Sequence, residues 1–247
     1  MNDHFIKPDW PVSKKISAFT TLRTNGVSTG GYSSWNLANH VDDDKSSVYK
    51  NRELLQDRLA LPNSPIWLQQ VHGVKIFQPG SNESDVIPEA DGSYTDLVDQ
   101  VCCVLTADCL PVLITNKRGT EVAAVHAGWR GLADGVVEAA LNKFQSKRED
   151  LLVWLGPAIG PDVFEVGDEV REAFCEYDPK ATKAFRISEN NTLLADIYQL
   201  ARQRLQLSGV SSVFGGDFCT FTEKDKFFSY RRNAITGRMV SLIWIHA

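Results

Sequence analysis

The sequence predicts a mixed α+β fold in which strands and helices form separate layers. Three observations lead to this expectation. Segments that favour β-strands outnumber those that favour helices, several strands follow one another without an intervening helix, and the chain contains no internal repeat. A regular alternation of strand and helix would instead have indicated a doubly wound sheet. No stretch has the composition of an interdomain linker, so we expect residues 1–247 to form a single domain.

The composition favours a globular protein that acts on small molecules. Its 247 residues are 43% hydrophobic, which is enough for a substantial core, and the formal net charge is -5. Nucleic-acid and membrane-surface binders usually have a basic binding domain, so we expect neither partner. No apolar run reaches the roughly 18 residues that a membrane span needs. Five cysteines without a repeating spacing indicate reduced thiols, and we expect a cytoplasmic location.

The N-terminal part predicts a strand, a glycine-rich loop and a helix. β-Branched and aromatic residues favour a strand at 16–22, and the loop follows at 23–32. A helix is expected at 44–61, where an Asp/Ser cluster can cap its start and Pro62 stops it. Backbone amides of the loop, with Arg23 beside them, could bind an anion, although an ordinary connecting loop explains the same residues.

The central part is rich in strands. Short apolar or β-branched runs predict strands at 66–71, 74–77, 101–106, 110–115, 121–126 and 151–155. Residues 82–88 are polar and read as a surface loop, after which the chain could bring Asp91 back towards the ends of these strands. A helix is expected at 130–145, because its apolar positions recur every four residues.

The C-terminal part predicts two helices and a hairpin. The glycine and proline cluster at 156–161 breaks regular structure, and helices are expected at 168–177 and 193–207. The segments 227–232 and 238–245 are interpreted as the two strands of a hairpin.

Three side chains that can ligate a metal share one kind of position, the end of an apolar strand beside glycine. They are His72, Cys109 and His126. Zinc accepts such ligands tetrahedrally, and three protein ligands with one open position are typical of a catalytic site. The spacings match no short metal motif, and each residue taken alone is better explained as a hydrogen-bonded core histidine or an inert buried thiol. The shared position, where functional groups are usually displayed, is what predicts a metal site with Cys109 and His126 in catalysis.

Charged residues near these motifs have two interpretations. Asp108 points away from Cys109 if the segment is extended, so we expect it to bind a neighbouring backbone group or arginine. Arg130 and the pair Arg231 and Arg232 are candidate anion-binding residues, because a guanidinium binds phosphate bidentately. Surface salt bridges are the alternative role for these arginines.

Seven segments together resemble one known family. They are Thr20 to Leu37, Gln69 to Gly73, Thr106 to Pro111, Val125 to Gly131, Gly156 to Pro161, Phe164 to Gly167 and Phe228 to Arg232. Along nearly its whole length the chain is similar to the laccase-domain family, also called multicopper polyphenol oxidase or YfiH-type proteins. Two departures, at residues 22–25 and at Asp162 and Val163, affect details of substrate contact.

The resemblance implies a layered mixed β-sandwich flanked by helices, with His72, Cys109 and His126 as metal ligands. The implied cofactor is zinc, with copper possible. The implied reaction is phosphorolysis of adenosine, inosine or methylthioadenosine to the base and ribose 1-phosphate, with adenosine deamination as a further activity. Purine nucleosides and phosphate are therefore the expected partners. Our candidates for substrate binding are Arg23, Arg130 and Arg231. We expect the protein to be a monomer or a homodimer.

Three alternatives stay open at the level of sequence. A multicopper oxidase joins several histidine-rich copper sites, yet this chain has five histidines and no His-x-His pair, so we expect zinc. A metal-free Cys-His hydrolase would use Cys109 as nucleophile and His126 as base, but would leave His72 unexplained. A quality-control factor for cell-wall precursors, with a structural zinc in a peptide-binding module, is the non-enzymatic alternative.

Overall fold

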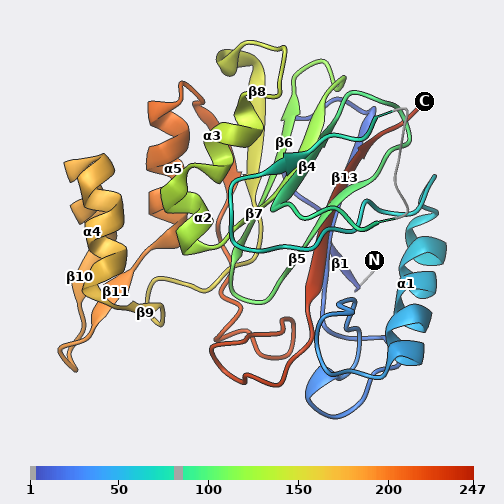
Figure 1. Cartoon of the computed structure of the whole chain (residues 1–247), viewed down its shortest axis with the longest axis horizontal. Helices are drawn as coiled ribbons and strands as arrows, with labels where there is room; N and C mark the ends of the chain where they lie inside the picture. The colour runs from blue at the N-terminus through green and yellow to red at the C-terminus, as the bar shows by residue number, and fades with distance from the viewer. Residues whose placement is uncertain (1–3, 81–85) are drawn as a thin grey trace.

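Two β-sheets face each other and are flanked by helices on both outer sides (Figure 1). The computed structural model describes residues 4–80 and 86–247. In Figure 1 the layers follow one another from α1 through the two sheets to α2, α3 and α5, with α4 outermost. This arrangement confirms the predicted α+β class and the layered mixed β-sandwich flanked by helices.

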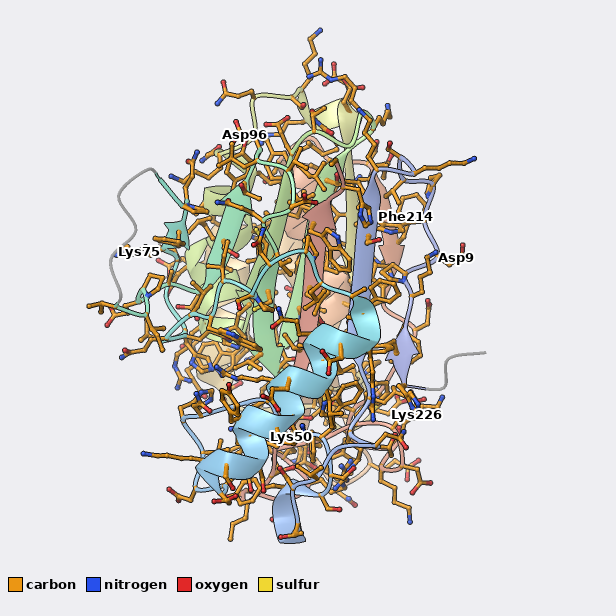
Figure 2. All side chains as sticks on the ribbon, turned by 90° about the vertical axis from the view of Figure 1, so that its right-hand side faces the viewer. Asp9, Lys50, Lys75, Asp96, Phe214 and Lys226 are labelled. Carbon is orange, nitrogen blue, oxygen red and sulfur yellow. The ribbon has the colours of Figure 1, made fainter. Side chains whose placement is uncertain are left out.

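The first sheet has four antiparallel strands in the order β1-β2-β13-β5. Its strands are β1 (Phe5–Ile6), β2 (Ile16–Thr21), β13 (Met239–Ile245) and β5 (Cys102–Thr106). The side chains alternate between the two faces. In β13, Leu242 and Trp244 pack with Leu55 of α1 (Lys45–Leu59), whereas Ile243 and Ile245 face the second sheet. Figure 2, viewed from this side, shows α1 in front of the strands, with Lys50 on it.

The second sheet has six strands in the order β12-β8-β6-β7-β4-β3. Its strands are β12 (Ser212–Gly215), β8 (Leu151–Leu155), β6 (Leu110–Asn116), β7 (Val122–Ala127), β4 (Gly92–Thr95) and β3 (Ile76–Phe77). The central strands β8, β6, β7 and β4 are antiparallel, and the outer strands β12 and β3 pair in parallel. Leu113 of β6 packs between the two sheets, while Val112 and Ile114 face the helices.

The outer face of the second sheet carries the remaining helices and a small third sheet. The helices are α2 (Trp129–Asp134), α3 (Val136–Leu141), α4 (Asp168–Tyr177) and α5 (Ile197–Leu207), with short 3-10 turns η1 (Gly30–Tyr32), η2 (Arg148–Asp150) and η3 (Pro179–Ala184). The third sheet joins β10 (Phe185–Ile187), β11 (Leu193–Ala195) and β9 (Glu165–Val166) in that order. Leu132, Phe174 and Leu200 place α2, α4 and α5 in one apolar cluster with the second sheet. Among the described residues, every helix is too short or too polar to cross a membrane.

The predicted strands around 16–22, 101–106, 110–115, 121–126 and 151–155 are confirmed within one or two residues, as are the helices at 44–61 and 168–177. The start of α1 follows the expected chemistry, because the Asp44 carboxylate accepts a hydrogen bond from the Ser47 amide at 2.9 Å. The helix ends at Ala60, which has a left-handed φ of 46° and lies two residues before Pro62.

Two predicted helices were wrong in extent. The segment 130–145 forms two short helices, because Gly135 adopts a φ of 97° that ends α2 and begins α3. The segment 193–207 begins as β11, which pairs with strands on both sides. The helix α5 starts only after Asp196, whose side chain accepts a hydrogen bond from the Gln199 amide.

The predicted hairpin of 227–232 with 238–245 was also wrong. Residues 227–229 have no regular secondary structure, residues 230–232 form a turn, and β13 pairs with β2 and β5 instead. The Arg232 guanidinium donates hydrogen bonds to the carbonyls of Thr220, Phe221 and Phe227, so its contacts are made across loops and not in a strand ladder.

The predicted strands before β4 are shorter than expected. The segment 66–71 makes only isolated bridges, at Ile66 and Gln69, and 74–77 is reduced to β3. Of the predicted loop at 82–88, residues 82–85 lie outside the described residues, and residues 86–88 form neither helix nor strand.

The layered packing predicts a large penalty for truncation between the sheets. Leu113→Ala should lower the free energy of unfolding by about 2 to 5 kcal/mol, because this fully buried side chain would leave a cavity that neither sheet can close. Leu207→Ala is the matched control, since Leu207 is 54% exposed at the end of α5 and should change stability by less than about 0.5 kcal/mol. Urea unfolding of both variants measures the difference, and equal penalties would contradict this description of the core.

Candidate metal centre

One edge of the six-stranded sheet gathers the residues of the candidate site. Cys109 directly precedes β6, and His126 is the penultimate residue of β7. These strands are antiparallel, with Pro111 opposite His126, so the start of one lies beside the end of the other. Asp91 precedes β4, whose first residue is opposite Val125. The turn that contains His72 comes shortly before β3, which runs parallel to β4.

The side chains of His72, Cys109 and His126 converge at this edge. Each offers one donor atom, and the three atoms lie within 4.8 Å of one another. Cys109 Sγ is 3.7 Å from His72 Nε2, and the two imidazole rings stand edge to face with their centroids 4.8 Å apart. His126 is buried, Cys109 is partly buried and His72 is exposed. The cluster therefore opens to solvent on the side of His72.

The carboxylate of Asp91 organises the cluster from behind. It is fully buried, and its Oδ1 lies 2.8 Å from His126 Nδ1. The same carboxylate accepts hydrogen bonds from the backbone amides of Val71, His72 and Gly73, at 3.2, 2.9 and 2.7 Å. Burial alone would raise the pKa of Asp91, but these hydrogen bonds and the one from His126 lower it. Asp91 therefore fixes the His126 ring and the His72 turn together, leaving Nε2 of His126 to face the cluster.

The cysteine and histidine of the cluster polarise each other. Burial by itself would raise the pKa of the Cys109 thiol, but the charge of His126 and hydrogen bonds from His126 and His72 lower it well below its usual range. Burial would lower the pKa of His126, yet the Cys109 thiolate and Asp91 raise it. A thiolate beside two imidazoles is a donor set that binds zinc or copper, and it is also the arrangement of a Cys-His nucleophile pair.

Two residues of the site have left-handed backbone conformations that side chains other than glycine adopt rarely. His72 has a φ of 62° and Asp108 a φ of 88°. As expected, the Asp108 carboxylate binds neighbouring groups: it accepts hydrogen bonds from the Thr220 hydroxyl and the Arg231 amide, both at 2.6 Å. The turn that presents Cys109 is thereby tied to the C-terminal loops, which hold its strained backbone in place.

The absence of a side chain at Gly128 creates the space between the ligands. A Cβ atom at this position would lie 2.7 Å from His72 Cδ2 and 3.3 Å from Cys109 Sγ. Gly131 similarly brings α2 against the His72 turn, since a Cβ atom there would lie 2.9 Å from the Gly73 carbonyl oxygen. The close approach of α2 and the Cys-His donor set both suit a small metal ion.

The three arginines predicted to bind substrate lie in different surroundings. The Arg23 guanidinium donates to the carbonyls of Ser33 and Lys224 through all three of its nitrogens. Arg231 donates to the Glu165 carbonyl, and Arg130 is exposed on α2, with its guanidinium 4.3 Å from the Trp129 ring centroid. Within the described part of the chain, no hydrogen bond joins these side chains to the three candidate ligands.

Sequence reasoning missed two residues that the fold places near the cluster. Arg238 directly precedes β13. The negative charges of Cys109 and Asp108 favour the charged form of its guanidinium. The His40 side chain is exposed to solvent on one side, but neighbouring atoms remove part of its hydration. This partial desolvation lowers its pKa, as do the charges of Arg238, Arg52 and His126. Neither lies in a local metal or phosphate motif, so the position of Arg238 before an apolar strand was the only available signal. Cys219 lies on a neighbouring loop, where its sulfur accepts a hydrogen bond from the Gly160 amide at 3.3 Å.

The tight contact at Gly128 predicts a specific effect on metal binding. Gly128→Ala should lower the affinity for a metal ion roughly tenfold or more, because the added methyl group displaces the His72 ring from its orientation. Gly80→Ala is the matched control, since a Cβ atom there meets no atom of the described residues within 4 Å. Metal titration of the two apoproteins measures the affinities. Wild-type affinity in Gly128→Ala would show that this glycine does not shape the site.

Comparison with known proteins places the chain in a family. Residues 17–246 match the family model described as multi-copper polyphenol oxidoreductase laccase. A Haemophilus influenzae protein named purine nucleoside phosphorylase is 52% identical over 242 residues, covering 97% of this chain and 98% of its own length. The Escherichia coli K12 protein named purine nucleoside phosphorylase YfiH is 52% identical over 240 residues, with the same two coverages.

Solved structures agree with this placement. A crystal structure of a Neisseria meningitidis protein superposes with a TM-score of 0.94 at 43% identity, covering 99% of this chain and 100% of that one. The structure of YlmD from Geobacillus stearothermophilus gives a TM-score of 0.92 at 28% identity, covering 100% of this chain and 98% of that one. Since the family model spans nearly all of the sequence, the chain belongs to the multi-copper polyphenol oxidoreductase laccase family.

Proposed function

We propose that the protein is a zinc-dependent purine nucleoside phosphorylase. The observation that carries the proposal is a Cys-His cluster, oriented by Asp91, in a chain that is 52% identical over 97% of its length to a relative named purine nucleoside phosphorylase. The proposed substrates are adenosine, inosine and methylthioadenosine with phosphate, which yield the free base and ribose 1-phosphate. Adenosine deamination is proposed as a side activity.

In this proposal His72, Cys109 and His126 hold the zinc ion, and Cys109 and His126 also face the reacting groups. A bound zinc ion supplies a Lewis acid and can activate water. Asp91 accepts a hydrogen bond from the N–H group at Nδ1 of His126. The lone pair of Nε2 is then left for coordination of the metal. Cys109 contributes a thiolate, the form favoured by its lowered pKa. The exposed side of His72 leaves a direction from which a nucleoside can approach.

Phosphorolysis also requires a phosphate that is oriented towards the ribose C1′ atom. Arg23, Arg130 and Arg231 are the proposed substrate contacts, because a guanidinium can hold two phosphate oxygens at once. Arg130 is exposed two residues after Gly128, and the backbone amide of Arg231 is bonded to Asp108, the neighbour of Cys109.

The donor set suits a single zinc ion better than a cluster of several copper ions. Within residues 4–80 and 86–247, the clustered side chains with metal-ligand atoms form one group of three. An oxidase that passes electrons between several coppers needs more histidine ligands than this group provides. We therefore propose one zinc ion per chain and at most weak oxidation of polyphenols.

Replacement of the sulfur ligand tests metal and reaction together. Cys109→Ser exchanges a thiolate for a weakly coordinating hydroxyl, so the zinc content should fall steeply and release of adenine from adenosine should fall at least a hundredfold. The measurements are metal analysis of protein purified without added metal, and chromatography of adenine, ribose 1-phosphate and inosine with and without phosphate.

Cys175→Ser is the control for this change, because Cys175 lies on α4 and bonds to Thr182, away from the cluster. It should keep both zinc and activity. Phosphate-dependent release of adenine at full rate in Cys109→Ser would remove the metal from the mechanism. Several tightly bound coppers in the wild-type protein would refute the choice of zinc.

A Cys-His hydrolase is the second candidate, favoured by one specific observation. Asp91, His126 and Cys109 form a connected series in which a buried carboxylate orients the histidine beside a thiol of lowered pKa. In that reaction the Cys109 thiolate would attack the carbonyl carbon of an amide, and His126 would donate its proton to the leaving amine. Water would then hydrolyse the resulting thioester and release the acid.

Removal of the metal separates the candidates. Under the proposed function, a chelator should abolish phosphorolysis while the circular dichroism spectrum stays unchanged, and added zinc should restore the activity. Unfolding on chelation would indicate a structural site. Activity that survives the chelator but is lost when an electrophile labels Cys109 would favour the hydrolase.

A further inference from the structure

The first sheet contributes an arginine to the neighbourhood of the metal centre. In the pairing of β13 with β5, Met239 lies opposite Thr106. Arg238 is the residue before this pair, and on the other strand the chain continues from Thr106 through Ala107 and Asp108 to Cys109. The register of the sheet thus sets Arg238 beside the segment that presents the cysteine ligand.

The backbone around Arg238 is firmly held. Its amide donates a hydrogen bond to Asn36 Oδ1 at 3.0 Å, and the buried Asn36 side chain is bonded in turn to Asp43 and to the backbone of Ala38. Gly237 is packed closely, since a Cβ atom there would lie 2.8 Å from both Asn36 and Phe228. Arg238 therefore has a defined position, which binding of a small ion requires.

The guanidinium is anchored on one side and available on the other. Its Nη1 donates to the carbonyls of Thr236 and Gly237, at 2.8 and 3.1 Å. Within the described residues, Nε and Nη2 make no hydrogen bond, and this pair forms the edge that binds two phosphate oxygens in parallel. Arg23 differs, because each of its three nitrogens already donates to a carbonyl.

The surroundings of the guanidinium strengthen its interaction with an anion. The side chain is half-buried, and its Cζ lies 5.7 Å from the ring centroid of Tyr230, which is 56% exposed. Tyr230 directly precedes Arg231, whose amide binds Asp108. Partial burial weakens the screening of charge by water. The carboxylate of Asp108 accepts hydrogen bonds from Thr220 and the Arg231 amide, and Arg238 forms no ion pair with any residue that the structure describes.

We propose that Arg238, with Tyr230 below it, forms an anion-binding site beside the metal centre and that this site binds inorganic phosphate. This inference rests on the proposed phosphorolysis, for which it names a phosphate contact that lies outside the sequence motifs. Arg238 acts by binding and orienting phosphate, while the metal ligands stay with His72, Cys109 and His126.

Steady-state kinetics of the zinc-loaded enzyme tests the proposal. Arg238→Gln should raise the KM for phosphate roughly tenfold to a hundredfold, the cost of losing a charged hydrogen-bond donor, and should leave the KM for inosine within about twofold. Arg238→Lys should recover part of the loss, because lysine keeps the charge but cannot donate from two adjacent nitrogens. The zinc content of both variants should equal that of the wild type.

Arg118→Gln is the matched control. Arg118 is an exposed arginine in the turn between β6 and β7, at the opposite end of these strands from Cys109, and its loss should change neither KM. An unchanged KM for phosphate in zinc-loaded Arg238→Gln overturns the proposal. So does an equal rise in both KM values, which would indicate a structural role for the Nη1 hydrogen bonds.

A measurement on the wild-type protein decides the matter if the variants fail to fold. Phenylglyoxal modifies accessible arginines, and inorganic phosphate should protect Arg238 from it, as followed by peptide mass spectrometry. Modification of Arg238 at the same rate with and without phosphate overturns the anion site. If the wild type shows no phosphate-dependent cleavage of nucleosides, the proposed function fails, and the protection experiment still tests the anion site separately.

Discussion

The carboxylate of Asp91 is the interaction on which the candidate site depends. It is buried, and none of the lysines and arginines in the described part of the chain pairs with it. Three backbone amides of the 71–73 turn and the His126 ring satisfy its oxygens. A buried carboxylate is costly unless its oxygens are hydrogen-bonded, so the turn and the ring are held where they satisfy it. One residue thereby couples the positions of two candidate ligands that are far apart in sequence, and the backbone bond from the His126 amide to the Asp91 carbonyl adds a second link.

The Cys109 side of the site is held in a different way. There, hydrogen bonds from the C-terminal loops fix a turn with a strained backbone. Asp108 has a left-handed conformation just before β6, and hydrogen bonds from Thr220 and the Arg231 amide compensate for that strain. Such a backbone directs Cys109 towards the histidines while Asp108 turns towards the C-terminal loops. The strands β6 and β7 form a rigid base for both halves, because their side chains are buried on both faces of the sheet.

The sequence predicted those structural features that are determined by residues close together in the chain. The cap at Asp44, the buried runs of β6, β7 and β8, and the placement of Cys109 and His126 at the ends of β6 and β7 could all be read from neighbouring residues. His72 instead lies in a turn, because the segment before it makes only isolated bridges. The break at Gly135 was hidden by an apolar pattern that continues across it. Pairing across long sequence separations decided the rest: Leu193–Ala195 became a strand because partners lay on both sides, and Arg238 reached the site through the register of β13. Apart from its position before an apolar strand, nothing in the sequence around Arg238 indicates that it lies near the site.

The position of β13 at the centre of the first sheet has a consequence for the order in which the site is assembled. All three candidate ligands and Asp91 lie between residues 72 and 126, whereas β13 is formed by Met239–Ile245. A chain emerging from the ribosome exposes its N-terminal part first. The metal donors are therefore synthesised well before the strand that carries Arg238 can insert between β2 and β5. The donors also precede Thr220 and Arg231, which hold the turn that presents Cys109, so the candidate site is complete only after these C-terminal segments have been synthesised and have packed against it.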